Sequence, residues 1–421
     1  MKSAWKRFIP LGPLILLAVA TVVLPGVMAS CGQEQPVTVE QPRTIEGVPT
    51  IRVRITPAPA DTAVLSTTGG YRLKLDGRYI VNGPAALAAT SVRRADKTWV
   101  FNDRGAEGNV LSVEPQAGSF VRVGNVLYRG WLRFLPVEGD RFIIVNHVDV
   151  ESYLAGVLPK ELYPAWMSET YRALAVAART FAVYQSKTYG LAHEYDLGDD
   201  QASQMYGGFS AETDKSWNAV RQTHGQVLVF GPRGAEQIFL AQYSACCGGV
   251  VNGAYVLRNA PQVQPLLGGQ ECTYCRNCPR YRWDPVIIAK ADIRRALTAA
   301  YPAAAELDRL DKINVVSSAA SARPIWLDVV GANGKSLRVR ADDLRLALLR
   351  VRDPAPAAQR LYSMNCRLQD LGDSIAFCDG RGYGHGVGLC QWGAQGMAAE
   401  GIPAEQILSF YYPGAKLYKA Y

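Results

Sequence analysis

The sequence predicts an α+β fold in which an antiparallel β-rich N-terminal region precedes a mixed helix and strand core. Residues 50–147 consist of short runs in which apolar and polar residues alternate between turn residues, the pattern of antiparallel strands. Residues 148–421 combine segments with helical apolar spacing and segments that alternate. These segments show no internal repeat and no regular strand–helix–strand order, which disfavours a doubly wound sheet.

The first 31 residues have the composition of an export signal. A basic start is followed by an apolar run from Ile9 to Val27. Met28-Ala29-Ser30-Cys31 then resembles the lipid-attachment box of bacterial lipoproteins, which predicts that Cys31 becomes the lipidated first residue of the mature protein. The alternative is an uncleaved membrane anchor, although prolines in the apolar run disfavour a stable spanning helix. Both interpretations place the rest of the chain outside the cytoplasm, in the cell envelope.

Composition sets limits on the remaining chain. Residues 32–49 are polar and contain prolines, so they are expected to form a flexible tether. With 48% hydrophobic and 19% charged residues, the chain has the composition of an ordinary globular protein. Its length of 421 residues allows one large core or two medium ones. A formal net charge of +8 suits an anionic wall surface. No basic run is interleaved with aromatic residues, so nucleic-acid binding is not expected.

Three segments of the β-rich region are clear strand candidates. Ile51–Ile55 and Tyr71–Leu75 alternate, and Asp76-Gly77 after the second is a hairpin-turn pair. Arg141–Val145 is apolar after its first residue, which predicts a buried strand ending near Asn146. The region carries no pattern of catalytic residues. We therefore interpret it as a scaffold or a wall-docking surface.

The core from residue 148 alternates between helices and strands. Its first clear helix is predicted from Trp166 to Tyr189, and a loop follows at residues 199–208, with strands and turns to about Ser244. The later predicted elements are, in order, a helix at Ala291–Tyr301, strands within Ile313–Val339 around a turn at Ala332-Asn333-Gly334, a helix at Asp342–Val351, and a last helix between Pro403 and Pro413-Gly414.

One carboxylate of the core has an unusual setting. Glu161 lies between Pro159 and Pro164 and has apolar neighbours on both sides. The spacing predicts a helix entrance, where an acid with such neighbours resists ionisation and can donate a proton to a leaving-group oxygen. The alternative is a structural residue that interacts favourably with the helix dipole. Glu151, the other nearby carboxylate, is interpreted as a cap or strand-end residue.

Two segments of the core form recognisable motifs. The first comprises Glu151-Ser152-Tyr153-Leu154, Pro159-Lys160-Glu161-Leu162 and Ala178-Arg179-Thr180, and the second runs from Gly382 to Ala394. These motifs resemble those of the stage II sporulation D / amidase-enhancer family (SpoIID/LytB), and the likeness extends from about Ile51 to the C-terminus. The resemblance implies action on the glycan strands of bacterial peptidoglycan.

The resemblance places the catalytic acid of a lytic transglycosylase at Glu161. In such an enzyme a single glutamic acid protonates the leaving group and then takes the proton of the muramic-acid 6-hydroxyl. That oxygen closes on C1 and leaves a 1,6-anhydro-N-acetylmuramic acid end. The expected substrates are glycan strands, including strands denuded of stem peptides. Two alternatives stay open: a non-catalytic wall-binding protein that stimulates an N-acetylmuramoyl-L-alanine amidase, and a glycoside hydrolase that leaves reducing ends.

The motifs also suggest residues that bind or orient the substrate. Arg179 is expected to hold a substrate carboxylate or acetamido oxygen, because a cation beside Glu161 would lower the pKa of the general acid. Its alternative is a buried salt bridge. His385 lies among alternating glycines and either contacts glycan or hydrogen-bonds neighbouring backbone. Further candidates to line the groove are Gln391 of the second motif, and Gln204 and Tyr206 of another segment that resembles the family.

Five of the nine cysteines gather in residues 246–278, and they suggest a metal site. Cys272, Cys275 and Cys278 have the C-x2-C spacing of a zinc knuckle. The resemblance supports this, because some family members bind zinc with cysteines at positions matching Cys247, Cys272 and Cys275. The histidine that such members carry just upstream is absent here. Cys278 or Cys246 is therefore expected to complete a structural zinc site.

Disulfides are the alternative to zinc, because an exported protein meets an oxidising environment. Cys366 and Cys378 are expected to pair in this way. Cys390 follows the glycine-rich motif, at a position where many relatives have Ser. It is not expected to act as a nucleophile, because no arrangement of a histidine and an acid surrounds it in the sequence.

Overall fold

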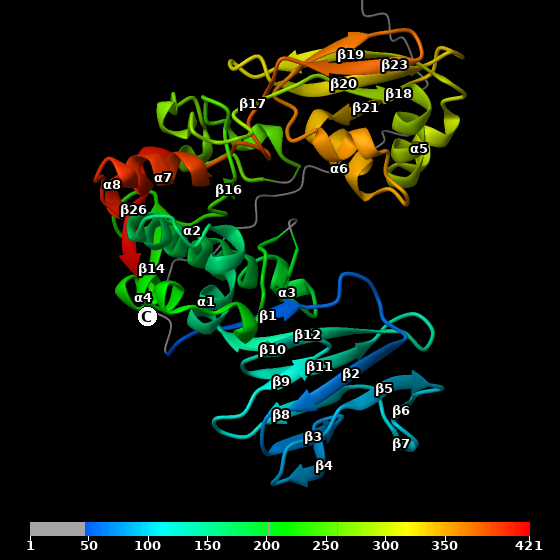
Figure 1. The fold of residues 1–421 in the computed structure, drawn as a ribbon, viewed down its shortest axis with the longest axis vertical. Coiled ribbons are helices and arrows are strands. Elements are labelled where there is room, and N and C mark those ends of the chain that lie inside the picture. The colour runs from blue at the N-terminus through cyan, green and yellow to red at the C-terminus, as the bar shows by residue number, and fades with distance from the viewer. Residues whose placement is uncertain (1–46, 201–202, 259) are drawn as a thin grey trace, which may run out of the picture. The chain divides into compact units, whose positions relative to one another are not determined.

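The computed structural model describes residues 47–200, 203–258 and 260–421 (Figure 1). It confirms the predicted α+β class: strands fill the first part of the described chain, and helices with small sheets follow. The export signal, Cys31 and residues 32–46 of the expected tether lie outside the described residues. Within the described ranges, no helix combines the length and the apolar character needed to cross a bilayer.

The N-terminal region forms two sheets, drawn in blue and cyan in Figure 1. One has seven strands in the order β13-β1-β12-β11-β8-β3-β4, and the other has six in the order β10-β9-β2-β5-β6-β7. Neighbouring strands are antiparallel except for β1 and β13. The bounds are β1 Thr50–Arg54, β2 Thr62–Thr67, β3 Tyr71–Leu75, β4 Arg78–Gly83, β5 Thr90–Ala95, β6 Thr98–Phe101, β7 Arg104–Glu107, β8 Leu111–Pro115, β9 Val121–Val123, β10 Val126–Tyr128, β11 Trp131–Pro136, β12 Phe142–Asp149 and β13 Leu197–Gly198.

The alternation of apolar and polar side chains accounts for these strands. In β1, Ile51 and Val53 point into the main apolar cluster, as their period-two spacing predicts. β12 is longer than predicted, because it stays buried on both faces beyond Asn146. The predicted hairpin turn is confirmed: Asp76 and Gly77 have φ of 47° and 82°, the positive values that a type I′ turn requires.

The main apolar cluster, which contains the strands, also includes side chains of α1, α2, α4, α7 and α8. The bounds are α1 Val150–Glu161, α2 Ser168–Ser186, α3 Tyr189–Ala192, α4 Asp214–Gln222, α7 Gln391–Ala399 and α8 Ala404–Tyr411. α2 is buried over most of its length and packs against α1, α4, α7 and α8. Figure 1 shows the C-terminal helices, in red, beside α2 despite their distance in sequence. The two sequence motifs therefore meet in one body.

Short strands complete this arrangement. β14 Gln226–Phe230 pairs with β15 Gln237–Ile238 and with the C-terminal β26 Lys416–Lys419, and β17 Arg282–Trp283 pairs with β24 Gly380–Arg381. β16 Tyr243–Ser244 runs parallel to β25 Leu389–Cys390. The last pairing sets Ser244 opposite Cys390. It thereby holds the start of the glycine-rich motif's helix beside the segment that precedes the cysteine cluster.

The sequence predicts strands and turns between residue 208 and Ser244, but α4 lies there. Its start is fixed by a capping box in which Thr213 and Ser216 exchange side-chain and backbone hydrogen bonds. Only a narrow apolar stripe of this helix is buried, chiefly Ala219 and Val220. That stripe is too short to produce a clear helical period in the sequence.

The predicted position of Glu161 at a helix entrance is also wrong, because Glu161 is the last residue of α1. The helix begins at the other end of this segment, where the Asp149 side chain accepts a hydrogen bond from the Ser152 N–H at 2.9 Å. Glu161 therefore lies at the negative end of the helix dipole. That end disfavours a carboxylate and favours the neutral acid.

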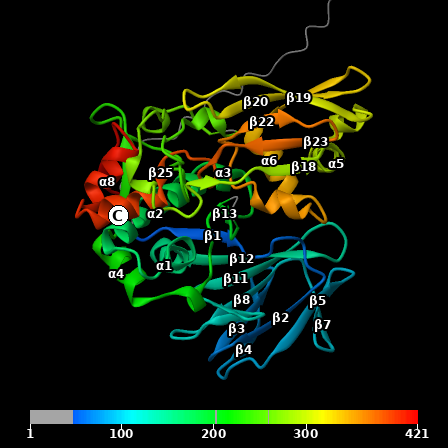
Figure 2. The same ribbon diagram turned by 45° about the horizontal axis from the view of Figure 1, so that its top comes forward.

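Residues 286–377 form a second apolar cluster within the predicted core. It contains the three-stranded sheets β18-β23-β22 and β19-β20-β21 together with α5 and α6, drawn from yellow to orange in Figure 2. The bounds are β18 Val286–Ala289, α5 Lys290–Ala300, β19 Leu310–Ser318, β20 Pro324–Gly331, β21 Ser336–Arg340, α6 Ala341–Arg350, β22 Arg367–Asp370 and β23 Ser374–Cys378. This unit is thus inserted between the two sequence motifs.

Candidate functional site

The end of α1 borders a cavity of about 720 Å³, here called the Glu161 cavity. Its walls come from residues 159–166, residues 242–245, residues 383–392 and α6. The first three segments belong to the main apolar cluster, whereas α6 belongs to the inserted unit. The fold therefore brings both sequence motifs to one cavity and adds a wall that neither motif contains.

Three donors hold the Glu161 carboxyl in this cavity. The backbone N–H of Met205 donates to Oε1 at 2.9 Å, and the Tyr243 hydroxyl approaches the same oxygen at 3.4 Å. Gln391, the first residue of α7, donates from Nε2 to Oε2 at 2.9 Å. The carboxyl is thus fixed by residues from three distant parts of the sequence. The predicted involvement of Gln391 takes the form of a hydrogen bond to the acid itself.

The environment of Glu161 favours its neutral form. Burial raises the pKa of this carboxyl, and the hydrogen bonds from Met205, Gln391 and Tyr243 lower it without cancelling the effect of burial. The position at the C-terminal end of α1 acts in the same direction as burial. A group of this kind can give up a proton, and the three donors then stabilise the carboxylate that remains.

Gln204 supports the Glu161 carboxyl indirectly, through Tyr243. Its side chain is completely buried, accepts a hydrogen bond from the Tyr153 hydroxyl at 3.0 Å and donates to the Tyr243 hydroxyl at 3.0 Å. It therefore positions Tyr243 and does not line the cavity, which corrects the expected substrate contact. Tyr206 is corrected in the same way: it is buried, and its hydroxyl donates to Asn146 at 3.0 Å.

Arg179 has no access to substrate. It is completely buried and forms an ion pair with Glu151, with Nη2 and Oε2 at 2.6 Å. Glu151 also accepts hydrogen bonds from the Tyr421 hydroxyl at 2.6 Å and the Gly225 N–H at 3.1 Å. The expected role of Arg179 in binding substrate is therefore corrected to the alternative, a buried salt bridge that joins α1 and α2 to the C-terminus.

Replacing Arg179 with Met should lower the free energy of unfolding by about 3–5 kcal/mol, because the Glu151 carboxylate would remain buried without its cation. Denaturant unfolding of the purified variant measures this loss. The double variant Arg179→Met/Glu151→Leu should recover part of it, since no charge is then left unpaired. A variant of normal stability that no longer binds glycan would contradict the structural role.

His385 lines the Glu161 cavity. Its Nδ1 accepts a hydrogen bond from the Val387 N–H at 3.0 Å, so the proton of the neutral ring lies on Nε2. Burial lowers the pKa of His385 to about 4, and the nearby Arg323 and Arg345 act in the same direction against Asp342. At neutral pH this side chain is therefore uncharged. It makes the expected backbone hydrogen bond and lines the cavity, and its contact with glycan stays a prediction.

The glycines around His385 bring this segment close to its neighbour. Gly388 has a φ of 67°, and a side chain there would place its Cβ 2.0 Å from the carbonyl oxygen of Gln242. Gly386 has a φ of 72° and faces Asn252 closely. Only glycine combines this conformation with such an approach. The close packing keeps Tyr243, next to Gln242, in reach of Glu161.

Aromatic rings form the other side of the Glu161 cavity. Trp166 and Trp392 lie edge to face with centroids 5.0 Å apart, and Tyr163 contacts both at 5.2 and 5.9 Å. Tyr163 is exposed. Flat rings beside a polar site are suited to the apolar faces of sugar rings. In the sequence only Tyr163 and Trp166 are neighbours of Glu161, and Trp392 belongs to the other motif, so the contact of the three rings is seen only in the fold.

Four buried cysteines lie close together, and one of them belongs to the glycine-rich motif. The sulfur atoms of Cys247, Cys272, Cys275 and Cys390 all lie within 4.8 Å of one another. The first three were expected as ligands, and the fourth member of this group is Cys390, where Cys278 or Cys246 was expected. Cys390 was missed because its spacing in the sequence does not point to the other three cysteines. The pairing of β16 with β25 brings it to the cluster.

The geometry of this group fits a tetrahedral thiolate site. Zinc–sulfur bonds of about 2.3 Å place neighbouring sulfur atoms about 3.8 Å apart. The Sγ atoms of Cys247 and Cys275 are 3.6 Å apart. Backbone N–H groups of Cys247 and Gly393 both donate to the sulfur of Cys390 at 3.3 Å, as expected around a thiolate.

Cys366 and Cys378 are buried free thiols in this structure, and the disulfide expected between them is not formed. They lie in and beside the β22–β23 hairpin of the inserted unit, where Cys378 is paired across the sheet with Arg367 and not with Cys366. The strand register therefore offsets the two cysteines. Spacing in the sequence did not reveal this offset, because it depends on how the hairpin pairs.

Comparisons with known proteins agree with the first of the two motifs. The family model described as Stage II sporulation protein matches residues 138–230, which include α1, Glu161 and α2. An uncharacterized protein of Brachyspira hyodysenteriae is 28% identical over 316 residues, covering 75% of this chain and 78% of the relative. Stage II sporulation protein D of Bacillus subtilis is 28% identical over 301 residues, covering 68% and 79%.

A third relative carries a different name. The amidase enhancer of Bacillus subtilis is 26% identical over 301 residues, which cover 63% of this chain and 40% of the relative. The matches include the segment with Glu161 and extend well beyond it. Together with the two motifs that meet at one cavity, they support the resemblance of this chain to the SpoIID/LytB family.

Proposed function

We propose that this protein is a lytic transglycosylase that cleaves peptidoglycan glycan strands, with Glu161 as general acid and then general base. The observation that carries the proposal is the Glu161 carboxyl in its cavity, with a raised pKa and three hydrogen-bond donors around it. A glycosidic bond needs a proton on its departing oxygen, and a neutral carboxylic acid at the edge of a groove can supply it.

In the proposed reaction Glu161 donates its proton to the glycosidic oxygen while the bond between that oxygen and C1 breaks. The resulting carboxylate accepts the proton of the 6-hydroxyl of the same muramic-acid ring. The 6-oxygen forms the new bond to C1, so the product is an anhydro ring and no water is consumed. Hydrogen bonds from Met205 and Gln391 stabilise the carboxylate between the two transfers.

The charges of the cavity support a mechanism with one carboxylate. Its lining also includes Asp342 and Asp343. Asp342 is paired with Arg345 at 2.9 Å, and Asp343 with Arg258 at 2.7 Å. The nearby arginines hold the pKa of Asp342 at about 2, against the effect of its burial. Acids held as salt bridges are poor candidates for the second carboxylate of a hydrolase, which must activate water or attack C1.

We also propose that Cys247, Cys272, Cys275 and Cys390 hold a structural zinc ion. Four thiolates would close the tetrahedral site and leave no position for water, so the ion would contribute stability and no chemistry on substrate. Cys390 is followed directly by Gln391, the hydrogen-bond donor to Glu161. The metal site would therefore fix the start of α7 and with it one of the groups that hold the acid.

Incubating the purified protein with denuded glycan strands tests the catalytic proposal. Mass spectrometry of the products should find 1,6-anhydro-N-acetylmuramic acid ends. Reducing ends would instead indicate a hydrolase. Intact strands would favour the second candidate, a non-catalytic protein that stimulates an amidase, which is supported by the name of the amidase enhancer relative. Adding a cell-wall amidase and measuring its rate distinguishes that candidate.

The proposal includes a place in the cell envelope, with Cys31 as a lipid anchor to a membrane. This part rests on the export signal and the lipid-attachment box of the sequence. Incorporation of a labelled fatty acid by the expressed full chain, and its loss in Cys31→Ala, tests the anchor. Label retained by the variant would rule out lipidation at Cys31.

Replacing Gln391 with Leu should move the alkaline limb of the pH–rate profile to higher pH. Activity needs Glu161 protonated and falls as the pH rises through its pKa. The Gln391 amide stabilises the carboxylate, so its removal should raise this pKa further. The profile of kcat/KM between acid and alkaline pH measures the shift. Gln222→Leu, on the exposed side of α4, serves as control, and a shift to lower pH would contradict the assignment.

A further inference from the structure

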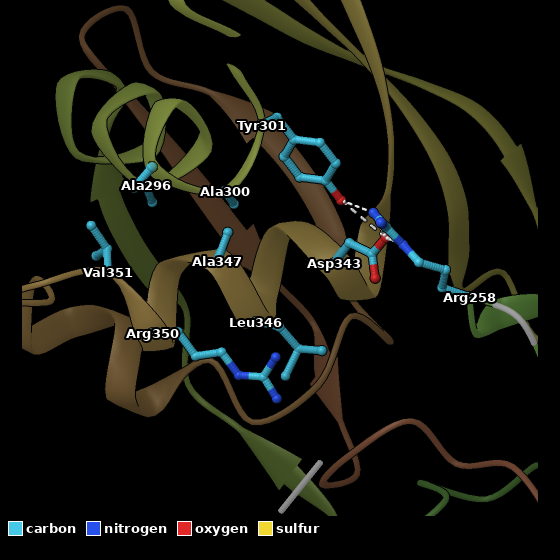
Figure 3. A pocket seen from close by; sticks show the side chains of 10 residues that line it. Arg258, Ala296, Ala300, Tyr301, Asp343, Leu346, Ala347, Arg350 and Val351 are labelled. Carbon is cyan, nitrogen blue, oxygen red and sulfur yellow. Dashed lines mark hydrogen bonds and ion pairs between the residues drawn. The ribbon is translucent and has the colours of Figure 1, made fainter. Parts of the chain in front are cut away.

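A second cavity of about 450 Å³, here called the alanine cavity, adjoins the Glu161 cavity. Both are lined by Arg258, Asp343, Leu346 and Arg350, so they lie side by side along α6. Figure 3 shows the alanine cavity between α5 and α6. Its floor consists of small side chains from these two helices, namely Ala296, Ala299, Ala300 and Ala347. This floor has room for a small apolar group.

The two arginines of the alanine cavity differ in their partners. Arg258 is ion-paired with Asp343 at 2.7 Å and also donates to the Tyr301 hydroxyl. Arg350, at the end of α6, makes no hydrogen bond or ion pair with any residue that the structure describes, and its side chain is exposed. In Figure 3 it runs along α6 toward Leu346. It is therefore a guanidinium free to bind an anion at the mouth of the cavity.

The two cavities together carry uncompensated positive charge. Asp342 and Asp343 are paired with arginines, and burial raises the pKa of Glu161. Lys160, beside Glu161, has no ion-pair partner among the described residues, and neither has Arg350. An unpaired cation thus lies next to the acid and another at the far end of α6. A ligand that runs along both cavities would gain from negative charge.

We propose that Arg350 and the alanine cavity form a subsite for the lactyl group of a muramic-acid residue. This inference rests on the proposed function, because it takes a glycan strand as the ligand. The lactyl group consists of a carboxylate and a methyl group on one carbon. The carboxylate suits the guanidinium of Arg350, which can bind it with two parallel hydrogen bonds, and the methyl group suits the alanine floor. An attached stem peptide would remove this charge, so the subsite selects strands with free lactyl carboxylates.

The test measures binding of three glycans to the full chain carrying Glu161→Gln, so that no strand is cleaved. The probes are denuded muramic-acid oligosaccharides, the same oligosaccharides with the lactyl carboxyl converted to a methylamide, and chitin oligosaccharides of equal length. The acid form should bind about fivefold to tenfold more tightly than the amide, the range of a charge-assisted contact at a partly exposed site. In Arg350→Gln the difference should disappear. Ala300→Leu, which fills the cavity floor, should weaken the acid and the amide together.

Arg352→Gln is the matched control, because its side chain is 97% exposed and it lines neither cavity. It should keep the discrimination between acid and amide. The subsite is wrong if Arg350→Gln still discriminates, if the parent protein does not discriminate, or if the parent binds none of the three glycans. If the protein discriminates through Arg350 but forms no anhydro ends, the subsite is supported and the catalytic proposal is wrong. The two proposals can therefore fail separately.

Discussion

Replacing Glu161 with Gln should abolish the formation of anhydro ends while leaving glycan binding intact. Glutamine keeps the size of the side chain and one of its two acceptor oxygens but cannot release a proton. General acid–base catalysis typically contributes about a hundredfold to ten-thousandfold in rate, and here one group serves both proton transfers, so a loss of about a thousandfold or more is expected. The measurement is the rate at which anhydro-N-acetylmuramic acid ends appear by mass spectrometry.

The control for this prediction is Glu138→Gln, which changes a glutamate whose side chain is 95% exposed. Its rate should equal that of the parent. Thermal unfolding of both variants checks that the fold is kept, and Glu161→Gln should be at least as stable as the parent at neutral pH, because it no longer has a charge to bury. Anhydro ends formed at the parental rate by Glu161→Gln would exclude Glu161 as the acid.

The candidate acid could be found from the sequence because its signal is local. Glu161 lies among apolar residues in a recognisable motif, and the structure places it where burial raises its pKa. Its surroundings could not be found in this way. The Tyr243 hydroxyl and the Met205 N–H reach the carboxyl only after α1 and the parallel pair of β16 and β25 have packed. Neither residue belongs to the quoted motifs.

Motif membership did not separate residues that contact the cavity from residues that support it. Arg179 and Gln204 lie in family-like segments, yet both are completely buried and hold other side chains in place. The sequence pattern does not distinguish a buried arginine that is paired with Glu151 from an exposed arginine that binds a ligand. The difference depends on which face of α2 meets α1, and helical spacing alone leaves this open for an Ala-rich helix.

The inserted unit explains another gap in the prediction. The bounds of α5 and α6 agree with the predicted helices to within a residue, because their apolar stripes are regular. The sequence still gave no reason to place α6 beside Glu161. Residues 286–377 have their own apolar cluster, and only the three-dimensional return of the chain at the glycine-rich motif brings Arg350 and Asp342 to the Glu161 cavity.

The assignment of Cys390 as a zinc ligand leads to a second large expected effect. Cys390→Ser should lose the metal and unfold at a clearly lower temperature, whereas Cys278→Ser should retain both metal and stability. Structural zinc sites in small peptides contribute about 10–16 kcal/mol of apparent binding free energy at neutral pH, so losing even a fraction of this is measurable. Metal content by mass spectrometry and thermal unfolding, with and without a chelator, provide the measurements.

The two serine variants separate the structural assignment from the one that spacing suggests, because Cys278 completes a C-x2-C pattern and Cys390 does not. Metal loss should also slow glycan cleavage, since Cys390 begins the turn into α7 and Gln391 then loses its fixed position beside Glu161. The activity of the chelated protein should return on adding zinc. Metal retained by Cys390→Ser, or lost by Cys278→Ser, would restore the ligand set that the spacing predicts. Paired cysteines in the purified protein, found by mass analysis, would replace the metal site with disulfides.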